Sequence, residues 1–196
     1  SEKNLNYYDN VYWKRCMLSK LIQDSKYSHS STVTGRSKII DGENYLVMKK
    51  SDRSKITSSF KGGKIIEIDI VSLEPRIFFR HNNFKSVDDV YTHVNNALNL
   101  NTSRSKIKLG MLAILYGAAD RTVKKLSGLT KEECEKIKKY FKTEELQSSL
   151  NKSFESNNCI HNMYGRPIYS NNSPINHYIQ STAADCAQIA FYDYLK

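Results

Sequence analysis

No stretch of this sequence is apolar enough to cross a membrane. The longest apolar runs, such as Met111–Leu115, fall far short of the ~20 residues that a membrane-spanning helix needs. The first residues, Ser-Glu-Lys-Asn-Leu-Asn, contain no apolar targeting segment. The sequence therefore predicts a soluble cytoplasmic protein with no membrane partner.

Cysteine is scarce, and its spacing does not fit a metal site. No two cysteines are separated by only two residues, and no histidine completes a zinc-binding pattern. We expect free thiols in a reducing compartment. The four cysteines are Cys16, Cys134, Cys159 and Cys186. The chain also lacks an internal repeat and a long linker, which favours one domain, or two closely joined subdomains, for its 196 residues.

Acidic residues are too few to balance the basic ones. The sequence has 30 Lys and Arg but 20 Asp and Glu, giving a formal net charge of +10. A basic surface attracts polyanions, and nucleic acid is the commonest such partner. A soluble protein that is basic without binding nucleic acid is the alternative. The hydrophobic content of 39% is that of a globular protein, so disorder is not expected.

The pattern of apolar residues predicts one strong strand among many helices. Four isoleucines and a valine favour a strand over Lys64–Val71, and Pro75 ends its pairing because proline has no amide donor. Asn162–Tyr169 has the composition of a hairpin or turn. The helices are predicted over Val11–Gln23, Val87–Leu98, Ser103–Tyr116 and Thr130–Phe141, and from Ile175 to the end. This mixture predicts an α+β fold.

Acidic side chains occur near the end of the predicted strand. Because side chains alternate between the faces of a strand, Glu67 and Asp69 share one face, and Ile66, Ile68 and Ile70 lie on the other. A carboxylate in apolar surroundings is costly unless it is paired or bound to a metal. Asp69 is therefore either a magnesium ligand, since that ion prefers oxygen, or a solvated residue at the end of an edge strand.

Four residues follow one another at intervals of four in the helix predicted over Ser103–Tyr116: Arg104, Lys108, Leu112 and Tyr116. Each interval advances about 400°, so the four side chains share one face. The cations lie at the N-terminal end, where they oppose the helix dipole and do not stabilise the helix. They suit a bound polyphosphate, with an aromatic ring further along to stack on a base. A solvated cationic face with Tyr116 in the core is the alternative.

The last predicted helix carries amides and small residues. Asn176 and Gln180 lie four residues apart on one face, and both donate and accept hydrogen bonds, as contacts to the minor groove require. The small side chains within Gln180–Asp185 allow another backbone to approach closely. Taken by itself, this segment is explained more simply by helix packing.

Together and in this order, these segments resemble the family A DNA polymerases over nearly the whole chain. Four segments carry the resemblance: motif A at Asp69–Arg76; motif B at Arg104, Lys108, Tyr116 and Gly117; the following palm helix at Gln180–Asp185; and a template-primer loop at Thr34-Gly35-Arg36. The sequence of motif A, with Val71 and Pro75, resembles that of phage enzymes more than that of bacterial repair enzymes. For a phage protein, the expected cytoplasm is that of the bacterial host.

The resemblance implies a DNA-directed DNA polymerase that transfers a nucleotide from a dNTP to a primer 3′-hydroxyl with two Mg²⁺ ions, or Mn²⁺ in their place. Asp69 and the backbone oxygen of Ile70 would hold the metals, and Glu74 would exclude a 2′-hydroxyl. Arg104 and Lys108 would be catalytic together with Asp69, because they would hold the triphosphate. Leu112 would also contact the nucleotide, at a position where the family usually has an aromatic residue. Tyr91 would contact it where the family often has a histidine.

The resemblance also implies contacts to primer-template DNA. Tyr116 would guard the templating base, next to Gly117. The other residues that it places on DNA are Thr34, Arg36, Arg166, Asn176 and Gln180. The implied organisation is the end of the thumb and entry to the palm in 1–36, the palm with motif A in 37–80, helical fingers in 81–161, and a return to the palm in 162–196.

One part of the family's site is missing from the sequence. The family takes its second metal-binding carboxylate from motif C, a His-Asp-Glu turn, and no His-Asp pair occurs in this chain. Because two-metal phosphoryl transfer needs that carboxylate, a second polypeptide or a further segment is expected to supply it. A non-catalytic module that binds primer-template or nucleotide is the alternative function.

Overall fold

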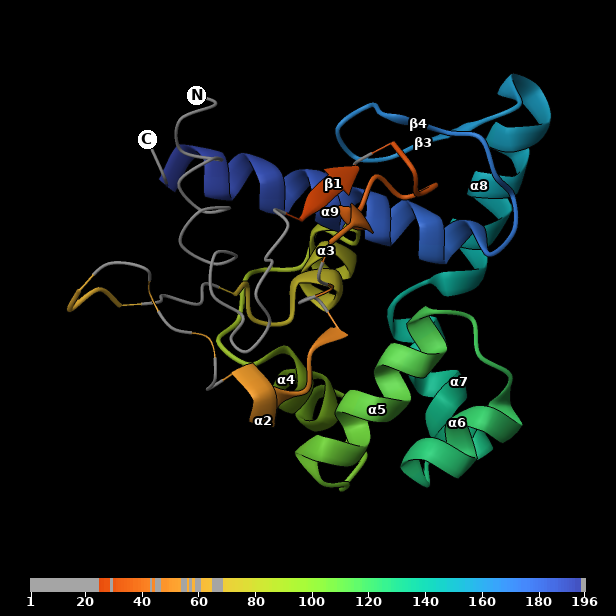
Figure 1. Ribbon diagram of the computed structural model, residues 1–196. Coiled ribbons are helices and arrows are strands. Elements are labelled where there is room, and N and C mark those ends of the chain that lie inside the picture. Colours follow the sequence, from red (N-terminus) through yellow and green to blue (C-terminus); the bar gives the residue numbers. More distant parts are fainter. Residues whose placement is uncertain are drawn as a thin grey trace. The chain divides into compact units, whose positions relative to one another are not determined.

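The computed structural model of the chain describes residues 25–28, 30–42, 44, 47–53, 56, 58, 61–64 and 69–194. Within them helices dominate, and the strands form two two-stranded antiparallel sheets (Figure 1). The chain divides into two compact units, Ser1–Asp69 with Ile189–Lys196, and Ile70–Gln188. The helix predicted over Val11–Gln23 and residues 65–68 of the predicted strand lie outside the described residues.

In the first unit a small hairpin precedes a short helix. Strand β1 (Lys26–Ser28) pairs with β2 (Lys38–Asp41), and helix α2 (Lys50–Arg53) follows. Ile39 is buried, with Tyr27, Met48 and Ile56 packed against it. The two strands flank the segment that contains Thr34, Gly35 and Arg36, and neither strand was predicted.

The prediction of a strand over Lys64–Val71 is wrong at both ends of this range, which are the parts of it that the structure describes. Lys64 and Asp69–Val71 are not in a strand, and Ser72 turns the chain with a φ of 55°. Helix α3 (Leu73–His81) then begins, with Pro75 in its first turn. Proline is tolerated there because its missing N–H would have no helical partner.

Six helices build the core of the second unit together with α9. They are α3, α4 (Val90–Ala97), α5 (Arg104–Leu115), α6 (Asp120–Ser127), α7 (Lys131–Tyr140) and α8 (Thr143–Asn157). Helices α4, α5 and α7 confirm three of the predicted helices. Helices α3, α6 and α8 were not predicted. A capping box begins α7, with Thr130 and Glu133 each accepting the other's backbone N–H. The packed aromatic rings of Phe78, Phe79 and Phe141 lie at the centre of this core.

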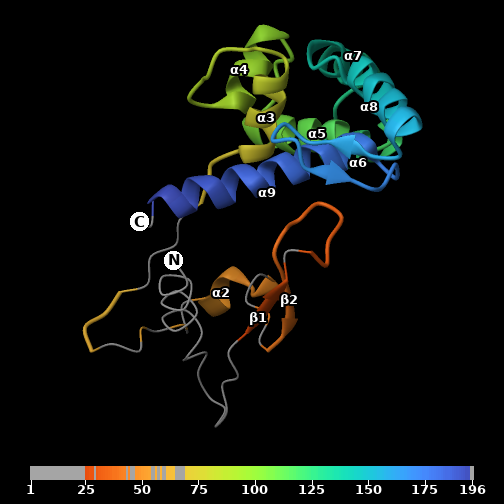
Figure 2. The same cartoon turned by 90° about the horizontal axis from the view of Figure 1, so that it is seen from above.

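The C-terminal part of the second unit is a hairpin that lies along a long helix. Strand β3 (Ile160–His161) pairs with β4 (Pro167–Ile168), which confirms the turn predicted within Asn162–Tyr169. Helix α9 (Pro174–Tyr194) confirms the last predicted helix and runs beside this hairpin (Figure 2). Among the described residues, no helix combines the length and the apolar character needed to span a membrane.

Candidate functional site

Helix α5 presents its basic side chains on the surface because its apolar face is buried. Ile107, Met111 and Leu115 are at most 1% exposed, whereas Arg104 and Lys108 are exposed. The Ser103 hydroxyl accepts the backbone N–H of Lys106 at the N-terminus of the helix. The helix ends at Tyr116, and Gly117 follows with a φ of 77°, as expected for a glycine that terminates a helix. The predicted basic face is therefore confirmed.

A glycine in the middle of α5 fixes how this helix packs. A Cβ placed on Gly110 would lie 2.2 Å from Cδ1 of Leu129 and 2.8 Å from Oγ of Ser127. Both of those side chains are buried, and the Ser127 hydroxyl donates to the carbonyl oxygen of Val123 at 2.7 Å. The loop after α6 thus lies directly against α5, on the side away from the basic face.

Arg104 is held by an aspartate that was not predicted. Asp89 caps α4 by accepting the backbone N–H of Tyr91 at 3.1 Å and the hydroxyl of Thr92 at 2.7 Å. The same carboxylate accepts Nε and Nη2 of Arg104 at 2.5 Å and 3.2 Å. These hydrogen bonds, with that from Arg104 the strongest, lower the pKa of Asp89 to about 2. Its carboxylate is therefore ionised at neutral pH.

Tyr91 lies beneath both cations of the basic face. Its side chain is buried, at 2% exposure, and its ring centroid lies 5.4 Å from Cζ of Arg104 and 5.9 Å from Nζ of Lys108. The face of an aromatic ring carries partial negative charge, so it attracts both cations and offsets part of their mutual repulsion. The predicted trio of Tyr91, Arg104 and Lys108 is thus brought together.

The two cations differ in how much of their charge is already neutralised. Asp89 pairs with Arg104 and also raises its pKa, mainly through their hydrogen bond. Among the described residues, no carboxylate pairs with Lys108. The site therefore holds two cations and one carboxylate beside the N-terminal half of a helix, where an anion is favoured by both the helix dipole and the side chains.

The other predicted nucleotide residues lie on neighbouring parts of the fold. Leu112 and Tyr116 are half-buried at the C-terminal end of α5, and Gly117 is exposed next to them. Glu74 is half-buried in the first turn of α3. Arg76, two residues further along α3, donates to the carbonyl oxygens of Val71, Val87 and Asp88, each at 2.9 Å. Arg76 thus ties the start of α3 to the segment before α4.

The predicted metal ligand Asp69 and the predicted DNA-binding loop with Thr34 and Arg36 belong to the first unit. Asp69 is exposed and is the last residue of that unit's first segment, whereas Ile70, half-buried, begins the second unit. Thr34 is buried and Arg36 is exposed in the loop between β1 and β2, where Gly35 has a φ of 67°. The predicted meeting of Asp69 with Arg104 and Lys108 stays a prediction, as do the DNA contacts of this loop.

A polar cluster joins the β3–β4 hairpin to α9. Arg166 donates to Oδ2 of Asp185 at 2.9 Å and to Oγ of Ser181 at 2.9 Å, and Asn162 donates to the same two side chains. Asp185 is only 18% exposed, so Arg166 and Asn162 supply the partners that a largely buried carboxylate needs. Arg166 therefore has a structural task, and its predicted contact with DNA stays a prediction.

The two predicted amides on α9 contact each other. Nε2 of Gln180 donates to Oδ1 of Asn176 at 2.6 Å, and both side chains are half-buried. Each amide keeps further donors or acceptors for another partner. Their spacing on one helix face is as predicted, while their contact with the minor groove is untested.

The described residues contain no group of three or more His, Cys, Asp or Glu side chains close enough to hold a metal ion. Magnesium in phosphate-binding enzymes often uses only one or two carboxylates, with substrate phosphates and water completing its coordination. The predicted binding of magnesium by Asp69 therefore stays a prediction.

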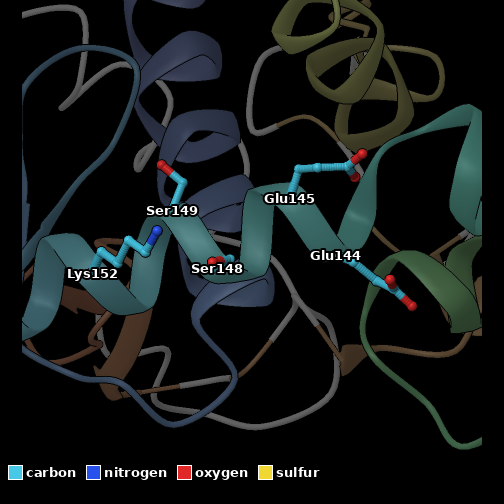
Figure 3. A pocket seen from close by; sticks show the side chains of 5 residues that line it. All are labelled: Glu144, Glu145, Ser148, Ser149 and Lys152. Atoms are coloured by element: carbon cyan, nitrogen blue, oxygen red, sulfur yellow. The ribbon is translucent and has the colours of Figure 1, made fainter.

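A surface hollow on α8 is lined by none of the predicted site residues. Figure 3 shows that its lining side chains come from this one helix: Glu144, Glu145, Ser148, Ser149 and Lys152. Its two carboxylates and single cation do not favour an anion, so the basic face of α5 remains the better candidate site.

Comparison with solved structures identifies a related fold. The chain is similar to the POL domain of Pol1 from M. smegmatis, in complex with DNA primer-template and dNTP, with a TM-score of 0.56 and 14% sequence identity. The fold resembles that of a DNA polymerase domain. The match covers 94% of this chain and 36% of the neighbour, so this chain spans about a third of that polymerase domain. No family model and no curated protein sequence matches the chain.

Proposed function

We propose that the chain is a segment or subunit of a DNA-directed DNA polymerase, and that the basic face of α5 binds the triphosphate of an incoming dNTP. The observation that carries this proposal is the joint placement of Arg104 and Lys108 over the ring of Tyr91. Their distances from the ring are 5.4 Å and 5.9 Å, within a chain whose fold resembles a polymerase domain.

The charges of this face fit a polyphosphate better than they fit a structural role. Lys108 has no carboxylate partner among the described residues, and both cations are exposed at the end of the helix where they oppose its dipole. A triphosphate would supply the missing negative charge and accept several charge-assisted hydrogen bonds. In the transition state the same cations would stabilise the charge that develops on the leaving pyrophosphate.

The proposed reaction is nucleotidyl transfer. The 3′-oxygen of the primer forms a bond to the α-phosphorus, while the bond from that phosphorus to the oxygen bridging to the β-phosphorus breaks. Pyrophosphate carries away the electron pair, and the proton of the 3′-hydroxyl passes to water. Asp69 and the backbone oxygen of Ile70 would help to hold two Mg²⁺ ions, which would lower the charge of the phosphates, and a carboxylate from another segment or chain would complete their binding.

The remaining site residues take their proposed roles from the family resemblance. Glu74 would exclude a 2′-hydroxyl, and Leu112 would face the sugar. Tyr116 and Gly117 would lie at the templating base. The residues proposed to contact primer-template DNA are Thr34, Arg36, Arg166, Asn176 and Gln180. In this proposal α4 to α8 belong to the fingers of a phage-like enzyme, while Asp69 and the last helix belong to its palm.

The proposal is tested by reconstituting primer extension. The chain is mixed with a polypeptide that carries a His-Asp-Glu hairpin, together with primer-template DNA, dNTPs and Mg²⁺, and extension is measured on a gel. We expect extension that Asp69→Asn abolishes while DNA binding survives, because that change removes a metal-binding charge only. Asp88→Asn, an exposed carboxylate elsewhere in the chain, is the matched control and should extend normally.

Two outcomes would count against this proposal. If the mixture binds DNA tightly but never extends the primer, a non-catalytic binding module is the better account. If Asp69→Asn extends as well as the control, the carboxylate of Asp69 has no role in the reaction.

A further inference from the structure

The guanidinium group of Arg104 has two paired edges, and the described residues occupy one of them. A guanidinium presents five N–H donors in a rigid plane, with one paired edge at Nε and Nη2 and another at Nη1 and Nη2. Asp89 takes Nε and Nη2. Among the described residues nothing takes Nη1. The edge that remains can still donate hydrogen bonds to two phosphate oxygens.

Asp89 is itself fixed by contacts that do not involve Arg104. Its two carboxylate oxygens also accept the backbone N–H of Tyr91 and the hydroxyl of Thr92, which lock the carboxylate to the first turn of α4. The plane of the guanidinium is thus set by a rigid partner rather than by a mobile side chain. The buried ring of Tyr91 supports it from one side at 5.4 Å.

We propose that Asp89 is a positioning residue that holds Arg104 so that its free edge faces a triphosphate bridging Arg104 and Lys108. This inference rests on the proposed function of the α5 face. Asp89 does not need to release Arg104 when the ligand binds, because the two partners use different edges of the guanidinium. Its function is to set the orientation of Arg104 in advance, at the cost of cancelling one positive charge.

This arrangement predicts selectivity rather than simple attraction for anions. A single phosphate responds mainly to the total charge, whereas a triphosphate that spans two cations also responds to their relative placement. Without Asp89 the net charge of the site rises by one, but Arg104 must be ordered by the ligand itself. Ordering one long side chain on binding typically costs enough to weaken affinity by roughly threefold to tenfold.

The test compares the affinities of dTTP and inorganic phosphate in EDTA, measured by calorimetry on the whole chain. We expect Asp89→Asn to weaken dTTP binding threefold to tenfold without weakening phosphate binding. Asparagine keeps an oxygen that can cap α4, so the helix should remain. Asp88→Asn makes the same change of net charge one residue earlier, where the side chain is exposed and does not contact Arg104, and it should not weaken dTTP binding.

A double-mutant comparison separates positioning from stability. If Asp89 acts through Arg104, then Asp89→Asn should change the ratio of dTTP to phosphate affinity in the normal chain but not in an Arg104→Gln background. Thermal unfolding is measured on every variant. Equal losses for dTTP and phosphate, or equal effects in both backgrounds, would show a purely structural role and overturn the inference.

The failure of the proposed function gives a different result. If the chain does not bind dTTP, or if Lys108→Ala leaves dTTP binding unchanged, the α5 face is not a triphosphate site and the role of Asp89 is rejected with it. If dTTP binds and Lys108→Ala weakens it, while Asp89→Asn behaves as Asp88→Asn does, only the role of Asp89 is rejected.

Discussion

The packing of α5 predicts that Gly110→Ala destabilises the protein. A Cβ at this position would lie 2.2 Å from Cδ1 of Leu129, and ordinary contact begins near 3.4 Å, so one of the two groups must move by about 1.2 Å. Leu129 is 1% exposed and has little room to move. Ser127, 2.8 Å away, is fixed by its hydrogen bond to Val123.

Two opposing effects set the size of the change. Alanine is a better helix former than glycine by about 1 kcal/mol, which favours the variant. Forcing an extra methyl group into a packed core typically costs about 1–3 kcal/mol. Because the clash is with two buried groups and one of them is hydrogen-bonded, we expect the steric cost to prevail. The free energy of unfolding should therefore fall, by up to about 2 kcal/mol.

Urea denaturation followed by circular dichroism measures this change, with the slope of the transition checked for two-state behaviour. Leu129→Ala alone should also destabilise the chain because it leaves a cavity. It should nevertheless reduce the cost of Gly110→Ala, because it removes the clashing methyl group, and the two effects should differ from additivity by at least about 0.5 kcal/mol. A Gly110→Ala variant as stable as the original chain, with additive effects, would refute the close packing of α5 against this loop.

Two further predictions concern the charged groups of the second unit. Asp185→Asn should lower the free energy of unfolding by about 1–3 kcal/mol, because Arg166 loses its ionic partner in a largely enclosed cluster, and urea denaturation compared with the exposed Asp88→Asn variant measures it. Asp89 has a pKa of about 2 in the folded chain and an ordinary value of 3.8, so its contribution to stability is present above about pH 4 and is lost as the pH falls through 2. The difference in stability between the original chain and Asp89→Asn should therefore narrow from pH 5 to pH 2, and a constant difference would contradict the ion pair with Arg104.

Local sequence signals were sufficient for the elements that form the basic face. The apolar residues of α5 recur at helical spacing, and a glycine, Gly117, follows the helix with a φ of 77°. The Thr130 capping box and the hairpin before α9 are equally local, since each depends on residues within a few positions of one another. Such features follow from backbone chemistry alone, which is why they were predictable.

Two of the unpredicted helices carried weaker or overlooked signals. Helix α8 has Leu146, Leu150 and Phe154 at intervals of four, a pattern that would have predicted it. Helix α6 has eight residues and only Val123 and Leu126 as large apolar side chains, which is too few for a clear period. Its position is instead set by the contact of Ser127 and Leu129 with Gly110.

The partners of charged residues were the part that the sequence could not provide. Asp89 precedes a predicted helix and could have been identified as its cap, but its bond to Arg104, 15 residues later, depends on how α4 packs beside α5. The same holds for Arg166 and Asp185, which are brought together by the hairpin lying on α9. Tyr91 was predicted beside the phosphates, and the structure adds that its ring is buried beneath the two cations.

The central claim, that the Arg104–Lys108 face of α5 binds a triphosphate, is tested most directly by titrating dTTP into the chain and into two lysine variants. Lys108→Ala should weaken binding roughly tenfold or more, since it removes a charge-assisted contact, while binding of primer-template DNA should change far less. Lys106→Ala removes an equal charge from the same helix, two residues away and thus on a different face, and should change dTTP affinity by less than about twofold. Equal losses in the two variants would show that only the overall positive charge matters, and would contradict a specific site on this face.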